Sequence, residues 1–179
     1  MNVNSHGSRR RKAPPHHEAQ DCNNNVDPRH HPHQQADFDI AREISALTKG
    51  RTDIGAVVSF SGICRDSENG EAIAALTLEH YPEMAEAEIA RHADIALSRW
   101  PLTGLTIIHR VGRIVPGENI VLVLTASAHR QAAFQAAEFL MDYLKANAPF
   151  WKREESAGGA NWVEARHHDD DAAARWTKS

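Results

Sequence analysis

The chain has 179 residues, of which 41% are hydrophobic and 25% charged, and its formal net charge is −4 at pH 7. This length suits one domain with a tail, and a chain of this size buries enough surface to fold without disulfides or metals. Two cysteines exclude a disulfide-rich secreted scaffold, and no apolar run approaches the roughly 18 residues of a membrane helix. The acidic balance argues against dedicated nucleic-acid binding, and the absence of an N-terminal apolar stretch predicts a cytoplasmic protein.

Residues 1–36 differ in composition from the rest of the chain. They contain four prolines, six of the twelve histidines and almost no apolar side chains. Such a segment cannot bury enough apolar surface to offset its loss of conformational entropy, so we predict a disordered His/Pro-rich tail. The histidines lack a second ligand cluster at fixed spacing, which favours a polar tail over a metal site.

From residue 37 the pattern alternates between helix and strand. Apolar residues at helical spacing predict a first helix over 37–47, and a β-rich run predicts a strand near 54–61. After a polar loop a second strand is expected at 72–81, and these two strands could form a hairpin. Pro82 then begins a helix that Pro101 ends.

The second half of the chain repeats this alternation. The remaining expected elements are strands at 105–111 and 120–125, a helix at 130–146, extended chain at 150–154 and a short strand at 162–166. Turn residues join the first two of these strands, which favours antiparallel pairing. Residues 37–179 are therefore predicted to form one α+β domain with a mainly antiparallel sheet and flanking helices.

The run Ser127-Ala128-His129-Arg130 follows an apolar strand and begins a helix. A helix N-terminus presents free N–H groups and a partial positive charge, and Ser127 is a competent N-cap. With His129 and Arg130 beside it, this end can bind a phosphate or a carboxylate. The residue types alone are equally consistent with a solvated Arg130 and with a His129 packed on the sheet.

A second cluster, Gly62 to Asp66, lies at the C-terminal end of a strand. Arg65 offers a planar guanidinium to a phosphate, although a strand-end arginine is more often a surface residue. Cys64 has no basic neighbour in sequence except Arg65, so a buried, inert thiol is favoured over a sulfur nucleophile.

A third cluster contains Lys145 and Lys152, with Pro149 between them. Lysines at this spacing would share a face of a continuous helix, but the proline breaks the helix and redirects the second, so both can converge on one pocket. Phe150 and Trp151 could desolvate an amine, which makes lysine a useful acid or base. Composition alone favours the simpler interpretation, a positively charged helix C-terminus.

Together these clusters resemble one family, the large, catalytic subunit of molybdopterin synthase. The resemblance covers about residues 38–176, and its motifs are long and ordered as in the family. The matching stretches are G-A-V-V-S-F-S-G-I-C-R-D (55–66), A-L-T-L-E-H-Y-P-E-M (75–84), R-W-P-L (99–102), I-H-R-V-G (108–112), S-A-H-R (127–130), M-D-Y-L-K (141–145), A-P-F-W-K-R-E (148–154) and W-V-E-A-R (162–166).

The resemblance implies an α/β-hammerhead-type α+β fold and a sulfurtransferase of molybdenum cofactor biosynthesis. The family's enzyme converts cyclic pyranopterin monophosphate into molybdopterin by adding two sulfurs as an ene-dithiolate. The sulfur arrives as the C-terminal Gly-Gly thiocarboxylate of a small ubiquitin-like subunit, whose tail enters a pocket of the large subunit. Two large subunits form a homodimer within a heterotetramer. The resemblance implies no metal site, no cofactor, no nucleic acid and no membrane.

Residue by residue, Lys145 and Lys152 match the family's catalytic lysines. The other matches are substrate-binding positions: Arg65, His129 and Arg130 as anion ligands, Ile63 and Cys64 lining the strand end, Arg153 and Glu154 beside the second lysine, and Arg166, contributed from the neighbouring subunit.

Two features depart from the family pattern, and two other functions compete with it. Residues 1–36 lie outside the family core, and we expect them to be dispensable for activity. Cys64 has no expected thiol role.

The main alternative function is a non-catalytic scaffold that binds a ubiquitin-like sulfur-carrier protein. Such a scaffold would tolerate alanine at both lysines. Nucleic-acid binding through basic residues 9–12 is disfavoured by the acidic charge and the aromatic content of 6%.

Overall fold

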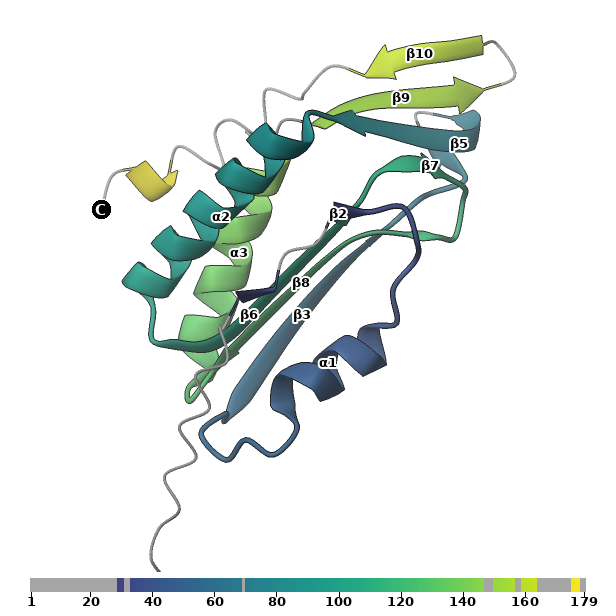
Figure 1. Ribbon diagram of the computed structural model, residues 1–179. Coiled ribbons are helices and arrows are strands. Elements are labelled where there is room, and N and C mark those ends of the chain that lie inside the picture. The colour runs from purple at the N-terminus through teal and green to yellow at the C-terminus, as the bar shows by residue number, and fades with distance from the viewer. Residues whose placement is uncertain are drawn as a thin grey trace, which may run out of the picture.

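The computed structural model describes residues 29–30, 33–68, 70–146, 150–156, 159–163 and 175–177. These residues form two β-sheets with helices packed against them (Figure 1). The helices are α1 (Ile40–Thr48), α2 (Pro82–Arg99), α3 (Arg130–Ala146) and the short 3₁₀-helix η1 (Arg175–Thr177).

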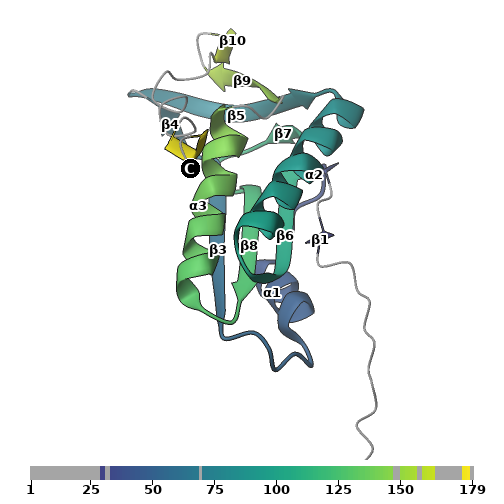
Figure 2. The ribbon, with the colours of Figure 1, turned by 90° about the vertical axis from the view of Figure 1, so that its left-hand side faces the viewer.

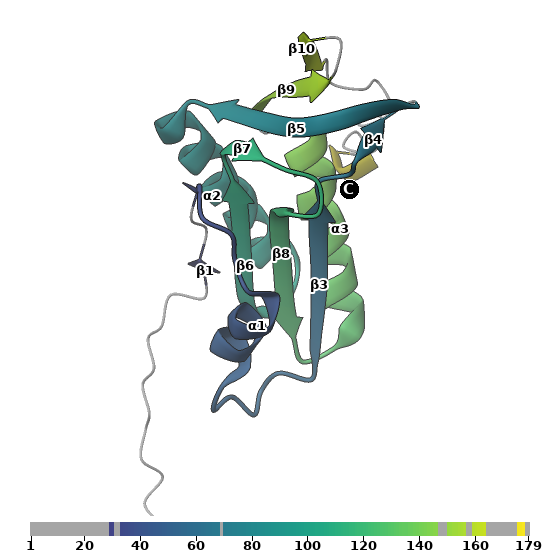
Figure 3. The ribbon, with the colours of Figure 1, turned by 90° about the vertical axis from the view of Figure 1, so that its right-hand side faces the viewer.

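The first sheet is built on three long antiparallel strands in the order β6-β8-β3. They are β3 (Ala56–Ile63), β6 (Leu102–Arg110) and β8 (Asn119–Ser127). Figures 2 and 3 show α2 and α3 on one face of this sheet and α1 on the other. Strand β8 is central and β3 lies at one edge, so β3 has a free side in the described part of the chain.

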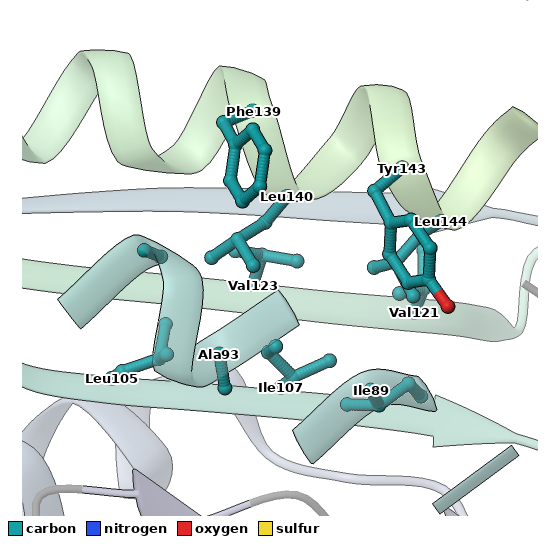
Figure 4. Close-up of a cluster of buried hydrophobic side chains, with 11 residues drawn as sticks. Ile89, Ala93, Leu105, Ile107, Val121, Val123, Phe139, Leu140, Tyr143 and Leu144 are labelled. Atoms are coloured by element: carbon teal, nitrogen blue, oxygen red, sulfur yellow. The ribbon is translucent and has the colours of Figure 1, made fainter. Parts of the chain in front are cut away.

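Strand β8 supplies side chains to a core on each of its faces. Val121 and Val123 join the cluster under α2 and α3, which Figure 4 shows from the side. Leu122 and Leu124 point the other way, into the cluster with Phe38 and the apolar residues of α1. The alternation follows from the two-residue period of a strand and explains why the run from Ile120 to Leu124 is apolar at every position.

The second sheet runs across one end of the first (Figures 2 and 3). Its strands are β4 (Ser67–Glu68), β5 (Glu71–His80), β7 (Gly112–Ile114), β9 (Phe150–Ser156) and β10 (Gly159–Val163). Every pairing in it is antiparallel, and β5 is its longest strand, paired with β4, β7 and β9.

The structure confirms the α+β class, the helix over 130–146 and the antiparallel pairing of the strands now seen as β6 and β8. The expected hairpin of the strands near 54–61 and 72–81 is wrong, because β3 pairs with β8 and β5 pairs with β9. The chain turns at Cys64 from one sheet into the other, and Cys64 N–H donates to the Glu118 carbonyl there. The final strand is Gly159–Val163, earlier than expected, and 164–166 lie outside the described residues.

The end of the predicted tail pairs with the first sheet. Residues 29–30 and 33–34 form strands β1 and β2, which run parallel to β6. Val111 N–H donates to the Gln34 carbonyl at 3.0 Å, and the Gln35 carbonyl accepts two N–H bonds, at 3.1 and 3.0 Å, from the buried guanidinium of Arg110. Residues 29–30 and 33–34 therefore cover the β6 edge, and the Gln35 carbonyl completes the hydrogen bonding of a buried charge.

Two N-terminal deletions distinguish the contribution to stability of residues 1–28 from that of the segment that pairs with β6. We expect removal of residues 1–28 to leave the melting temperature unchanged. Removal of 1–36 leaves Arg110 donors unpaired and should lower the melting temperature by roughly 5–10 °C. Thermal unfolding followed by circular dichroism measures both; equal melting temperatures for the two deletions would contradict the role assigned to residues 29–36.

Candidate functional site

The N-terminal end of α3 borders an open hollow of about 630 Å³. Its lining residues are Gly55, Ala128, His129, Arg130, Gln131, Phe134 and Gln135. His129 and Arg130 are both exposed there. Ser127 is fully buried at the end of β8; its Oγ donates to the Pro101 carbonyl at 2.9 Å and accepts from the His129 N–H at 3.3 Å. The hollow thus combines a helix N-terminus with two cationic or potentially cationic side chains, a combination that suits an anion.

Gly55 forms the wall of the hollow opposite the helix. A Cβ at this position would lie 2.2 Å from the backbone oxygen of Ala128, so no other residue fits without moving the helix start. The Gly55 N–H donates to the Ser127 carbonyl at 3.1 Å. The glycine therefore lets the beginning of β3 approach the turn that carries His129.

Lys152 lies far from this hollow along the chain, on β9 in the second sheet. Its partner in the register is Leu78, and Glu154 is paired with Leu76, so all four side chains share one face of the sheet. Leu76 and Leu78 are buried, whereas Lys152 is about one-third exposed. The Lys152 ammonium lies 2.5 Å from the Glu154 carboxylate, which is itself mostly buried. This is a charged pair at the margin of an apolar cluster.

Cys64 belongs to the same apolar cluster, with Leu76, Leu78 and Ile114. Burial raises the pKa of the Cys64 thiol, while the positive charge of Lys152 acts in the opposite direction. A raised pKa keeps the thiol protonated at neutral pH, which favours the inert role that the sequence analysis expected.

The other residues predicted for the site do not all lie on the same face as Lys152. Arg65 is exposed and forms an ion pair with Glu68, and Ile63 is 54% exposed at the end of β3. Arg153 points to the opposite face of the sheet, where its guanidinium lies 5.9 Å from the Trp162 ring. Arg166 lies outside the described residues, so its placement stays a prediction.

Lys145 occupies the last turn of α3 and is exposed. Three residues separate the end of α3 from the start of β9, so their ends are at most about 14 Å apart. The opposite end of the same helix carries Arg130. Arg130 and Lys145 are fifteen residue steps apart on α3, which span about 22 Å. The second sheet, which contains β9, crosses near the C-terminal end of α3 (Figures 2 and 3), so Lys145 lies at the helix end nearer β9, and His129 and Arg130 lie at the other.

Two histidines that the sequence analysis did not single out hold the first residue of β9. The Phe150 ring stacks on His109 at 3.9 Å and lies 6.0 Å from the His80 ring. These contacts fix the strand two residues before Lys152. The three residues come from separate strands, so no local spacing in the sequence indicates the contact.

The described part of the chain contains no group of three or more His, Cys, Asp or Glu side chains that could hold a metal ion. Within the same residues, no helix is long and apolar enough to cross a membrane. The described residues of the candidate site supply lysine, arginine, histidine, carboxylate and thiol groups.

Known proteins match most of the chain. Residues 33–147 match the family model described as "MoaE protein". A "Molybdopterin synthase catalytic subunit" of Mesorhizobium japonicum is 65% identical over 148 residues, which cover 82% of this chain and 92% of the relative. One of the same name from Brucella melitensis is 62% identical over 142 residues, 78% of this chain and 86% of the relative. The solved "Molybdopterin biosynthesis MoaE protein" of Burkholderia ambifaria superposes with a TM-score of 0.71 at 45% identity, covering 84% of this chain and 99% of that one.

The environment of Cys64 predicts slow alkylation. At pH 7.5 we expect iodoacetamide to modify Cys64 at least tenfold more slowly in the folded chain than in the urea-unfolded chain, because burial raises the thiol pKa and blocks access. Peptide mass spectrometry measures the rate at this residue. Equal rates in the two states would show an accessible, reactive thiol and reopen a sulfur-carrying role.

Proposed function

The chain belongs to the MoaE protein family, and on this basis we propose that it is the catalytic subunit of a molybdopterin synthase. The observation that carries the proposal is the 65% identity over 148 residues to a relative of that name. The matched region includes the helix end with Lys145 and the hollow beside His129. The reaction is the one that the sequence motifs imply, the sulfuration of cyclic pyranopterin monophosphate to molybdopterin.

The cationic residues suit the anionic parts of this reaction. The substrate carries a phosphate, and the sulfur donor ends in a thiocarboxylate. His129, Arg130 and the N-terminus of α3 form one anion site, and Arg65 offers a second guanidinium. A charge-assisted hydrogen bond contributes roughly 1.5–3 kcal/mol, so two or three of them fix a phosphate firmly.

The two lysines differ in their surroundings, which suggests different roles. The Lys152 ammonium forms an ion pair with Glu154, and this group can donate a proton to the oxygen that leaves when the cyclic phosphate opens. Lys145 has no ion-pair partner among the described residues. It is therefore the amine available to the acyl group of the donor tail, either as a cation that holds the carboxylate or as a nucleophile after sulfur has left.

The distance along α3 favours a site shared between two copies of the chain. A single phosphate group cannot contact both Arg130 and Lys145 of one chain when about 22 Å of helix separates these residues. In a homodimer, His129 and Arg130 of one copy can meet Arg65 and Lys152 of the other. Each site then contains residues from both copies, and a dimer has two equal sites.

Strand β3 offers the edge for such a dimer. It begins at Ala56, beside the turn to α3, and ends at Ile63, next to Cys64 and Arg65. If two β3 strands pair antiparallel about a two-fold axis, the beginning of one lies beside the end of the other. Phe60 and Ile63, both exposed in the single chain, would lie at the contact. This geometry supports the dimer and joins the two halves of the site.

The donor and the compartment follow from the same proposal. The sulfur donor is a small ubiquitin-like subunit with a C-terminal Gly-Gly. One such subunit binds each copy of the chain, which gives a heterotetramer, and the compartment is the cytoplasm.

The scaffold alternative predicts the same partner binding without turnover. Alanine variants of the lysines separate the two, because a scaffold does not need either amine.

A reconstituted sulfur-transfer assay tests the proposal. The chain is mixed with a thiocarboxylated small subunit and cyclic pyranopterin monophosphate, and dithiolene product is followed. We expect Lys145→Ala and Lys152→Ala each to lower turnover by about 100-fold or more, the range of a lost acid, base or nucleophile. Lys49→Ala, an exposed lysine at the end of α1, is the matched control and keeps the wild-type rate. Unchanged turnover in both variants, with the partner still bound, would favour the scaffold.

A further inference from the structure

The C-terminal helix η1 docks on α2 and α3 through one tryptophan. The Trp176 ring packs edge-on against Trp100 at 5.7 Å and against Phe139 at 5.6 Å. The Arg99 guanidinium lies over all three rings, at 5.2 to 5.8 Å from their centroids, and donates to the Trp176 carbonyl at 3.1 Å. Figure 2 shows the short helix beside α3. Aromatic and cation–π contacts of this kind hold a chain end in a defined position.

The polar atoms of the docked pair are directed at one carboxylate on α3. The Asp142 side chain accepts the Trp176 indole N–H at 2.7 Å and two N–H bonds from Arg175, at 3.0 and 2.5 Å. Arg175 also forms an ion pair with Glu138 at 2.9 Å. Asp142 is mostly buried by these contacts. Both carboxylates of this part of α3 are thus engaged by η1.

Glu138, Asp142 and Lys145 lie on the same face of α3. They are spaced by four and three residues, the spacing at which helical side chains are neighbours, with Cβ atoms about 5–6 Å apart. An acidic residue one turn before a lysine normally forms an ion pair with it. Here Asp142 is held by Arg175 and Trp176, and Lys145 has no ion-pair partner in the described part of the chain.

We propose that Arg175 and Trp176 are positioning residues for Lys145: docked on α2 and α3, they occupy the carboxylates of Asp142 and Glu138 and so leave the Lys145 amine available to the donor tail. The proposal rests on the role of Lys145 in the proposed function. It adds a reason for that role, since the same lysine without η1 would have a carboxylate partner one turn away. It also assigns a function to the Arg-Trp pair at the C-terminal end, which the sequence analysis did not single out.

The competing explanation is that η1 only fastens the chain end and adds stability. The two explanations differ at Lys145. A fastening role predicts a lower melting temperature when η1 is detached and no specific change at this lysine. The positioning role predicts a more strongly charge-paired amine, which reacts more slowly with an acylating reagent because less of it is unprotonated.

The experiment measures acylation of individual lysines in the full chain at pH 8 with acetic anhydride, followed by peptide mass spectrometry. Lys49 serves as the internal reference, because it is exposed at the end of α1 on the other face of the sheet. We expect Arg175→Ala to slow acylation of Lys145 about twofold relative to Lys49, the size of effect that one exposed helical ion pair produces. Arg175→Lys, which keeps a cation, should stay near the wild-type ratio.

A combined variant tests whether the effect on Lys145 depends on the two carboxylates. Adding Asp142→Asn and Glu138→Gln to Arg175→Ala removes the carboxylates that would pair with Lys145, so the ratio should return at least to the wild-type value although Arg175 is still absent. An unchanged ratio in Arg175→Ala, or a combined variant as slow as Arg175→Ala, would overturn the proposal and leave a fastening role.

Turnover in the sulfur-transfer assay then tests the catalytic role of Lys145 separately from its positioning by Arg175 and Trp176. If acylation changes as expected and Lys145→Ala retains turnover, the positioning of Lys145 stands and the proposed catalytic role fails. If Lys145→Ala abolishes turnover but Arg175→Ala leaves the acylation ratio unchanged, the proposed function stands and the positioning role fails. When both hold, Arg175→Ala should raise KM for the thiocarboxylated subunit about twofold, and the combined variant should restore it.

Discussion

The length of α3 is the constraint on which the rest of the candidate site depends. A helix has a fixed rise per residue, so the end that carries Arg130 and the end that carries Lys145 stay about 22 Å apart whatever the surrounding side chains do. The helix cannot bend to close this gap, because Phe139, Leu140 and Tyr143 hold it on the sheet in the largest buried cluster (Figure 4). The chain therefore carries cationic groups at both ends of α3, and the proposed dimer would bring the two groups together from different copies.

The sheets place each half of the site at the end of a strand. Strand β3 begins beside the α3 hollow, where only Gly55 fits, and ends at the turn that carries Cys64 and Arg65. At that turn the chain enters the second sheet, whose register sets Lys152 and Glu154 on the face of the buried Leu76 and Leu78. The apolar surroundings raise the free-energy cost of an unpaired charge, and the ion pair with Glu154 offsets it. Packing, strand register and charge pairing together thus determine the position of Lys152.

The sequence predicted what depends on local patterns. Helix α3 was predicted with its bounds, because its apolar spacing and Pro149 after it agree. Ser127, expected to cap the helix, instead lies buried at the end of β8, where its hydroxyl donates to the Pro101 carbonyl. The clusters with both lysines and with His129 and Arg130 were found from local residue patterns, and the family resemblance then assigned their roles. The pairing of strands was not predictable in the same way: neighbouring strands β3 and β5 look like a hairpin locally, but long-range pairing with β8 and β9 prevails. Contacts such as Trp176 on Arg99, or Phe150 on His109, join distant segments and leave no local signal.

Complementation between two inactive chains tests the central claim most directly. A Lys152→Ala chain and an Arg130→Ala chain are unfolded together, refolded as a mixture and assayed for sulfur transfer with the small subunit. If each site combines Lys152 of one copy with Arg130 of the other, the mixture should recover about a quarter of the wild-type rate, because half of the dimers are mixed and each has one intact site. If the mixture remains as inactive as either chain alone while dimers still form, each site lies within one copy and the account is contradicted.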